Sequence, residues 1–191
     1  GDRTINEKEA AIVQRIFNEY ASGKSPRSIA KDLNAEHIAG PSGKGWGPST
    51  IHGNRQRGTG ILNDELYVGR LVWNRLRYIK DPETGKRVSR LNPKEHWIVQ
   101  DVPDLRIVAD PLWQAVKSRQ DDQTADWNTD RFWDRKRPRH LFSGLMTCGV
   151  CGGGVVNLNA TRAGCANARN KGTCSNHRTI RRDRLEETIL D

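Results

Sequence analysis

The sequence predicts an α+β fold in two parts, with a mainly helical first domain that includes a small β-sheet and a much smaller second domain. Three observations predict it. The first 60 residues carry apolar side chains at helical spacing. Two later segments have the β-branched and aromatic content of strands. All four cysteines of the 191-residue chain fall between positions 148 and 174. We expect the first domain at 1–123, a basic linker at 124–140 and the second domain at 141–191.

Two helices are predicted near the start of the chain. Asn6 is a suitable N-cap, and the apolar residues that follow recur at intervals of three and four positions until Gly23. A second helix should begin at Ser25-Pro26, with Pro26 in its first position, and run out near Gly40. The inward-facing residues of both helices are Ile12, Val13, Ile16, Phe17, Tyr20, Ile29, Ala30 and Leu33.

A third, short helix is predicted from Gly47-Pro48 onward, after a glycine-rich turn in which Trp46 should pack on the helices. Three short helices with a turn before the third form the skeleton of a helix-turn-helix. The third presents mainly polar side chains, namely Ser49, Thr50, His52, Asn54, Arg55 and Arg57. Such residues read base edges in a DNA major groove, but a polar helix face is equally often only solvated.

The rest of the first domain should contain a small sheet and one more helix. Tyr67–Asn74 has strand composition, and Trp97-Ile98-Val99 is its expected partner. The segment between them, Lys80–Lys94, is predicted to be an exposed loop. A helix capped by Asp110 should then close the domain near Gln123, with Leu112, Trp113 and Val116 on its inner face.

The linker and the second domain carry most of the net positive charge. Residues 1–127 hold 20 Lys and Arg against 17 Asp and Glu, whereas residues 128–191 hold 12 against 6. The basic run of the linker consists of Arg135, Lys136, Arg137 and Arg139. Runs of this kind are often solvated tethers, yet between two DNA-binding units they can add phosphate contacts. Trp127, Phe132 and Trp133 suggest that part of the linker docks on a domain.

The cysteine spacing predicts one structural Zn²⁺ site. Cys148 and Cys151 form a Cys-x-x-Cys turn among glycines, and Cys165 and Cys174 follow to complete four thiolate ligands. Two disulfides or four unrelated thiols are the alternatives, but the cysteines cluster in one short segment and no signal peptide opens the chain. His177 is a possible substitute ligand, although a surface position suits it better. With few apolar residues nearby, metal binding should supply much of the folding free energy.

Composition limits the classes of partner. The formal charge of +9 and the pI of about 9.7 favour an anionic partner. No apolar run approaches the ~20 residues that span a bilayer, so we expect no membrane partner and an intracellular protein. The start at Gly1 and the end at Asp191 look like cut points within a longer protein. Ile180–Leu190 should be helical and is the start of a truncated helix or coiled-coil region.

Five segments in order resemble the C-terminal DNA-binding half of the large serine recombinases, or serine integrases. The first domain resembles the family's recombinase domain and the second its zinc ribbon, across nearly the whole chain. The matching segments are 11–25 (AIVQRIFNEYASGKS), 28–34 (SIAKDLN), 46–51 (WGPSTI), 66–74 (LYVGRLVWN) and 141–153 (LFSGLMTCGVCGG) with Cys165 and Cys174. The glycine-rich, basic stretch His52–Gly60 departs from the family pattern.

The resemblance implies binding of one half of a double-stranded DNA attachment site, in support of site-specific recombination by an N-terminal serine domain that this chain does not contain. No catalytic residue is therefore expected here. The partners would be DNA and other recombinase subunits, and the location the cytoplasm of a bacterium, with the gene bacterial or phage-borne. We place Arg162 at the tip of the hairpin between Cys151 and Cys165, against DNA, with Arg169 and Lys171 as weaker candidates.

Two other classes of protein share some of these sequence features. A zinc-containing helix-turn-helix transcriptional regulator would bind a palindromic operator through a dimer. A zinc-dependent hydrolase would need an open coordination position and a general base, and four cysteine ligands leave no open position.

Overall fold

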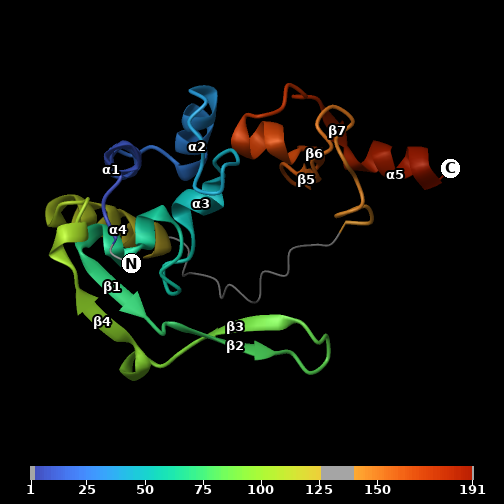
Figure 1. The fold of residues 1–191 in the computed structure, drawn as a ribbon. Helices are drawn as coiled ribbons and strands as arrows, with labels where there is room; N and C mark the ends of the chain where they lie inside the picture. The colour runs from blue at the N-terminus through green and yellow to red at the C-terminus, as the bar shows by residue number, and fades with distance from the viewer. Residues whose placement is uncertain (1–2, 126–139, 191) are drawn as a thin grey trace. The chain divides into compact units, whose positions relative to one another are not determined.

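The computed structural model describes residues 3–125 and 140–190, in which helices combine with short antiparallel strands (Figure 1). The α+β class is thereby confirmed. The chain divides into two compact units, one formed by 1–24 with 49–122 and the other by 25–48 with 123–191. The borders expected for the first domain, linker and second domain remain predictions.

The core of the first unit is built on helix α1 (Glu7–Ala21). The side chain of Asn6 accepts a hydrogen bond from the backbone N–H of Lys8, so the predicted N-cap is confirmed. Residues at helical spacing bury one face, namely Ala10, Val13, Ile16, Phe17 and Tyr20. This buried face agrees with the prediction except at two residues. Ile12, which was predicted to face inward, is half-buried, and Ala10, which was not predicted, is buried.

Helix α4 (Asp110–Ala125) packs against α1. The ring of Trp113 stacks on Phe17 with centroids 5.8 Å apart, and Val116 is fully buried. Arg119 donates hydrogen bonds to the carbonyl oxygens of Tyr20, in the last turn of α1, and of Gly23 and Lys24, just after it. Because carbonyl groups at the end of a helix lack the N–H donors of a following turn, the guanidinium acts as a C-terminal cap from another element.

Two small antiparallel sheets complete the first unit (Figure 1). Strand β1 (Arg70–Trp73) pairs with β4 (Ile98–Asp101), with Trp73 opposite Ile98, which confirms the predicted partner. Strand β2 (Leu76–Lys80) pairs with β3 (Arg87–Leu91). Two short 3₁₀ turns precede β1, at Ile61–Asn63 and Glu65–Val68. Two more follow β3 and β4, at Lys94–His96 and Pro103–Leu105.

The prediction of an exposed loop over Lys80–Lys94 is wrong, because this segment contains β3. The carboxylate of Asp81 accepts hydrogen bonds from the backbone N–H groups of Glu83 and Thr84, and Gly85 has a φ of +65°. These features reverse the chain in a tight turn. The sequence on either side lacks the apolar alternation of a half-buried strand, which is why the hairpin escaped prediction.

The second unit begins with helix α2 (Pro26–Ala35). Ser25 accepts a hydrogen bond from the N–H of Ser28, and Pro26 occupies the first helical position, as predicted. The helix ends five residues before Gly40, which corrects the predicted end. Trp46 is buried, and its backbone N–H and C=O both bond to the side-chain amide of Asn34.

The remainder of the second unit is a three-stranded antiparallel sheet followed by a helix. Strands β5 (Val155–Asn157), β6 (Arg162–Cys165) and β7 (Thr179–Arg181) lie side by side in that order. A π-helical turn, η5 (Asn167–Lys171), follows β6. Helix α5 spans Arg182–Leu190, so Ile180 belongs to β7 and not to the predicted helix. None of the helices in 3–125 and 140–190 is long and apolar enough to cross a membrane.

Candidate metal centre and nucleic-acid interface

The first two cysteines lie in a tight turn that the glycines make possible. The N–H of Cys148 donates to the carbonyl oxygen of Gly153 at 2.7 Å, and the N–H of Gly152 donates back to Cys148 at 2.8 Å. Gly152 has a φ of +66°, a conformation that residues with a Cβ rarely adopt. At Gly153 a Cβ would lie 2.4 Å from the amide nitrogen of Asn167. Side chains at these two positions would therefore disturb the turn.

The four thiols converge on one point. All four Sγ atoms lie within 4.8 Å of one another. The Sγ–Sγ distance is 4.0 Å for Cys148 and Cys174 and 3.6 Å for Cys151 and Cys165. A tetrahedral zinc site with Zn–S bonds of about 2.3 Å has S–S edges of about 3.8 Å. Since a disulfide needs about 2.05 Å, the thiols are not bonded to each other, and the arrangement suits a metal.

Two asparagines donate hydrogen bonds to the thiol cluster. The Asn167 amide lies 3.5 Å from Cys151 Sγ, and the Asn176 amide lies 3.4 Å from Cys148 Sγ. The backbone N–H of Asn176 also donates to Cys174 Sγ at 3.4 Å. Sequence reasoning missed both residues. The available signal was that each stands two positions after a cysteine, Cys165 and Cys174 respectively.

These donors and the close packing of the thiols set the acidity of the cluster. The Asn176 amide, followed by the N–H groups of Val150 and Cys151, lowers the pKa of Cys148 to about 6. At Cys174 the N–H of Asn176 lowers the pKa, but burial and the three neighbouring thiols together raise it to about 12. Without a cation, like charges keep one thiol protonated while another ionises readily. A bound cation would favour thiolate at all four positions.

The metal centre is also the core of its segment. The buried cluster around it consists of Cys148, Cys165, Ala168 and Cys174. No large apolar side chain belongs to this cluster, so burial of hydrocarbon contributes little to its stability. His177, the possible substitute ligand, is exposed and is not part of the thiol group.

The predicted DNA-contacting residues of the second unit lie on strand β6 and in the π-helical turn η5. Arg162 is exposed at the start of β6, directly after the turn at 159–161, and its guanidinium donates to Thr179 Oγ1 at 2.9 Å. Asn159 Oδ1 shapes the turn by accepting the N–H groups of Thr161 and Arg162. Arg169, which is exposed, and Lys171, which is half-buried, lie in η5.

The third helix of the chain is shorter than the set of residues assigned to it. Helix α3 spans Pro48–His52, so Ser49, Thr50 and His52 are helical. Asn54, Arg55 and Arg57 instead occupy a tight loop closed by reciprocal backbone bonds between Asn54 and Thr59. The backbones of Gly53 and Gly60 cross so closely that a Cβ on Gly60 would lie 2.5 Å from Cα of Gly53. The glycines of the unusual stretch 52–60 make this crossing possible.

The two loop arginines have partners in the protein. Arg55 forms a two-pronged ion pair with Asp121 on α4, and its Nη2–Oδ2 distance is 3.2 Å. Arg57 donates from Nη1 to Ser89 Oγ at 2.5 Å, on strand β3. Ser49, His52, Asn54 and Arg55 are exposed, whereas Thr50 and Arg57 are half-buried.

The predictions for the linker, including Arg135, Lys136, Arg137 and Arg139 and the docking of Trp127, Phe132 and Trp133, concern residues outside the described part of the chain.

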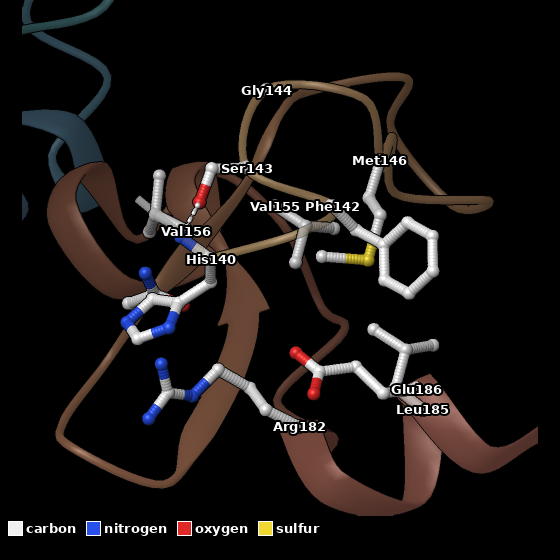
Figure 2. Close-up of a pocket in the computed structure, with 11 residues that line it drawn as sticks. His140, Phe142, Ser143, Gly144, Met146, Val155, Val156, Arg182, Leu185 and Glu186 are labelled. Carbon is white, nitrogen blue, oxygen red and sulfur yellow. Dashed lines mark hydrogen bonds between the residues drawn. The ribbon is translucent and has the colours of Figure 1, made fainter. Parts of the chain in front are cut away.

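The second unit also contains a cavity of about 180 Å³ next to α5 (Figure 2). Apolar side chains from the 140–146 segment, β5 and α5 form much of its wall, and Arg182 and Glu186 project from α5 toward it. The Nε and Nη1 atoms of Arg182 are buried without a hydrogen-bond partner in the structure. None of the four cysteines lines this cavity, so it is separate from the metal centre.

Comparison with known proteins identifies the class of the chain. Residues 7–123 match the family model described as Recombinase, and residues 141–191 match the recombinase zinc beta ribbon domain. The chain therefore belongs to the serine recombinase family.

One solved structure, described as the crystal structure of an LSR–DNA complex, is similar to this chain, where LSR denotes a large serine recombinase. The two share 17% sequence identity with a TM-score of 0.39, over 98% of this chain and 53% of the other. The present chain thus spans about half the length of that relative.

Proposed function

We propose that the chain binds double-stranded DNA at one half of an attachment site, and so supports site-specific recombination by a serine catalytic domain elsewhere in the protein. The observation that carries the proposal is the match of both segments, in order, to the two recombinase domains. Membership of this family favours a recombinase over the alternative of a transcriptional regulator. The similar solved structure is described as a complex with DNA, which is the partner proposed for this chain.

The thiol cluster is proposed to hold one structural Zn²⁺, with Cys148, Cys151, Cys165 and Cys174 as its ligands. Zinc prefers tetrahedral thiolate coordination, and the Sγ separations of 3.6 and 4.0 Å fit that geometry. Four protein ligands leave no position for a water nucleophile. The ion would therefore stabilise the fold of the second domain and would not hydrolyse DNA.

The two domains would divide the work of recognition. In the first, α3 with the loop that follows it would contact DNA through Ser49, Thr50, His52, Asn54, Arg55 and Arg57. In the second, the β5–β6–β7 sheet would present Arg162, and the turn η5 would present Arg169 and Lys171. The linker 124–140 would join the domains 1–123 and 141–191 and add phosphate contacts. Tethering makes binding of the second domain intramolecular, which suits a long site.

Selection of duplexes from a random pool tests this proposal. The zinc-loaded chain is incubated with the pool at about 150 mM salt, and the retained fraction is sequenced. We expect an enriched, asymmetric site longer than one helix-turn-helix could cover. A short palindrome would favour the regulator instead. Retention without any sequence enrichment would contradict attachment-site recognition.

A further inference from the structure

The hairpin β2–β3, here called the basic arm (residues 76–91), extends beyond the β1–β4 sheet of the first unit (Figure 1). The arm contains two acidic residues, Asp81 and Glu83, and five basic residues. The basic residues are Arg77, Lys80, Lys86, Arg87 and Arg90. The basic arm therefore carries a net positive charge.

Like charges lie directly opposite each other in the arm. The register pairs Arg77 with Arg90 and Lys80 with Arg87. Directly opposed like charges destabilise an antiparallel pair. Across the described residues, no carboxylate forms an ion pair with any of the four. Asp81 is held in the turn, where the N–H groups of Thr84 and Glu83 lower its pKa and Arg90 adds a smaller effect. The arm thus holds cations whose charge the protein does not neutralise.

The two faces of the arm differ. Because side chains alternate along strands, Tyr78, Lys80, Arg87 and Ser89 share one face, while Arg77 and Arg90 share the other. On the first face the Arg87 guanidinium lies 4.0 Å from the centroid of the Tyr78 ring. That ring is itself 56% exposed.

Arg57 joins the Tyr78 face through its bond to Ser89 Oγ. Arg57 and Arg87 are therefore both held in place by neutral groups, a hydroxyl and an aromatic ring. Neutral partners fix a guanidinium without cancelling its charge, which lowers the entropy lost when it binds an anion. With Lys80 beside them, they form a fixed basic surface.

We propose that the Tyr78 face of the basic arm binds the phosphate backbone of DNA, through Arg57, Lys80 and Arg87. This contact rests on the DNA binding proposed above. The arm would be a third DNA-contacting element, besides α3 with its loop and the β5–β6–β7 sheet. A two-stranded ribbon is narrow enough to enter a major groove, and its cations can reach the flanking phosphates. Contacts of this type raise affinity for all sequences and carry no base information.

The arm offers its own matched control. The variant Lys80→Gln with Arg87→Gln removes two charges from the Tyr78 face, and Arg77→Gln with Arg90→Gln removes two from the opposite face. Each full chain is titrated against a 40-bp duplex of arbitrary sequence at several salt concentrations. For the first variant we expect the slope of log K against log salt to fall by roughly two, and for the second a much smaller change.

Thermal unfolding separates this effect from loss of fold. Because each variant removes a like-charge pair, the midpoint should stay the same or rise while DNA affinity falls. Equal loss of slope in both variants would overturn the assignment to the Tyr78 face, and no loss in either would overturn the whole proposal. Those outcomes count against the arm only when the unmodified chain binds the duplex. If the unmodified chain does not bind, the proposed function itself has failed.

Discussion

The side-chain amide of Asn176 lies 3.4 Å from the Sγ of Cys148 and donates a hydrogen bond to it, while the backbone N–H of the same residue donates to Cys174. One residue thus orients two thiols that lie 26 positions apart in the sequence. Groups that donate to metal ligands stabilise the ionised ligand and fix its direction. Asn176 is therefore a positioning residue of the metal centre.

Replacement of Asn176 should weaken metal binding. In Asn176→Ala the backbone bond to Cys174 remains, but the bond to Cys148 is lost, so we expect zinc affinity to fall about tenfold. Competition with a chromophoric chelator measures the change. Ser175→Ala, at the exposed neighbouring position, is the matched control and should bind zinc normally. Equal affinities for the two variants would show that Asn176 does not position the thiols.

Removal of the metal should unfold the second domain selectively. The buried cluster in this segment consists of three cysteines and one alanine, so little apolar burial remains once the ion is lost. For Cys148→Ser we expect loss of zinc, and rapid hydrogen exchange throughout 141–178, with α1 and α4 still protected. Metal analysis and exchange mass spectrometry provide the two measurements. A zinc-free variant with full protection of 141–178 would contradict this account.

Arg119 should be important for the stability of the first unit. Its guanidinium bonds to three carbonyl oxygens at and just after the end of α1 and lies 4.2 Å from the Tyr20 ring centroid. Arg119→Ala removes these contacts together, and we expect a loss of about 2 kcal/mol in the free energy of unfolding. Urea denaturation gives the value. In the control Arg106→Ala, which breaks an exposed ion pair with Asp110, the loss should stay below about 1 kcal/mol.

Lys117 should make the stability of the first unit change with pH in the alkaline range. Its ammonium bonds to the Leu62 carbonyl and to the side chains of Asn63 and Gln120. Burial, followed by the charge of Arg55, lowers its pKa from 10.5 to about 8. Between these values the unfolded chain binds more protons than the folded one, so the free energy of unfolding should rise with pH.

The substitution Lys117→Met should remove this contribution and flatten the profile between about pH 8 and 10.5. Denaturation of the zinc-saturated chain at several pH values measures it. Lys8→Met, at an exposed position on α1, should keep the slope of the unmodified chain. An unchanged slope in the Lys117 variant would show that another group titrates there.

The linker arginines should contribute to affinity without contributing to specificity. Replacement of Arg135, Arg137 and Arg139 by Ala should weaken binding to all duplexes and lower the salt slope by up to about three. A control variant with Ala at Lys8, Lys94 and Arg106 removes the same charge from the first domain. If both variants have the same salt slope, the linker does not contact DNA.

Local chemistry explains which features of the fold and site could be predicted from the sequence. The starts of α1 and α2 follow from Asn6, Ser25 and Pro26, because caps and a first-turn proline act within a few residues. The thiol cluster was predictable because a Cys-x-x-Cys turn with two further cysteines has few other uses. The pairing of β1 with β4 followed from β-branched and aromatic composition.

Contacts between side chains that are distant in the sequence depend on the folded chain. The β2–β3 hairpin was missed because opposed cations carry no strand signal. The partners of Arg55 and Arg57, Asp121 and Ser89, lie 66 and 32 positions away, and no local pattern links them. Asn176 acquires its role only when β6 and the segment after it bring Cys148 and Cys174 together. Hydrogen bonds act over about 3 Å, so partners distant in sequence are set by the folded chain.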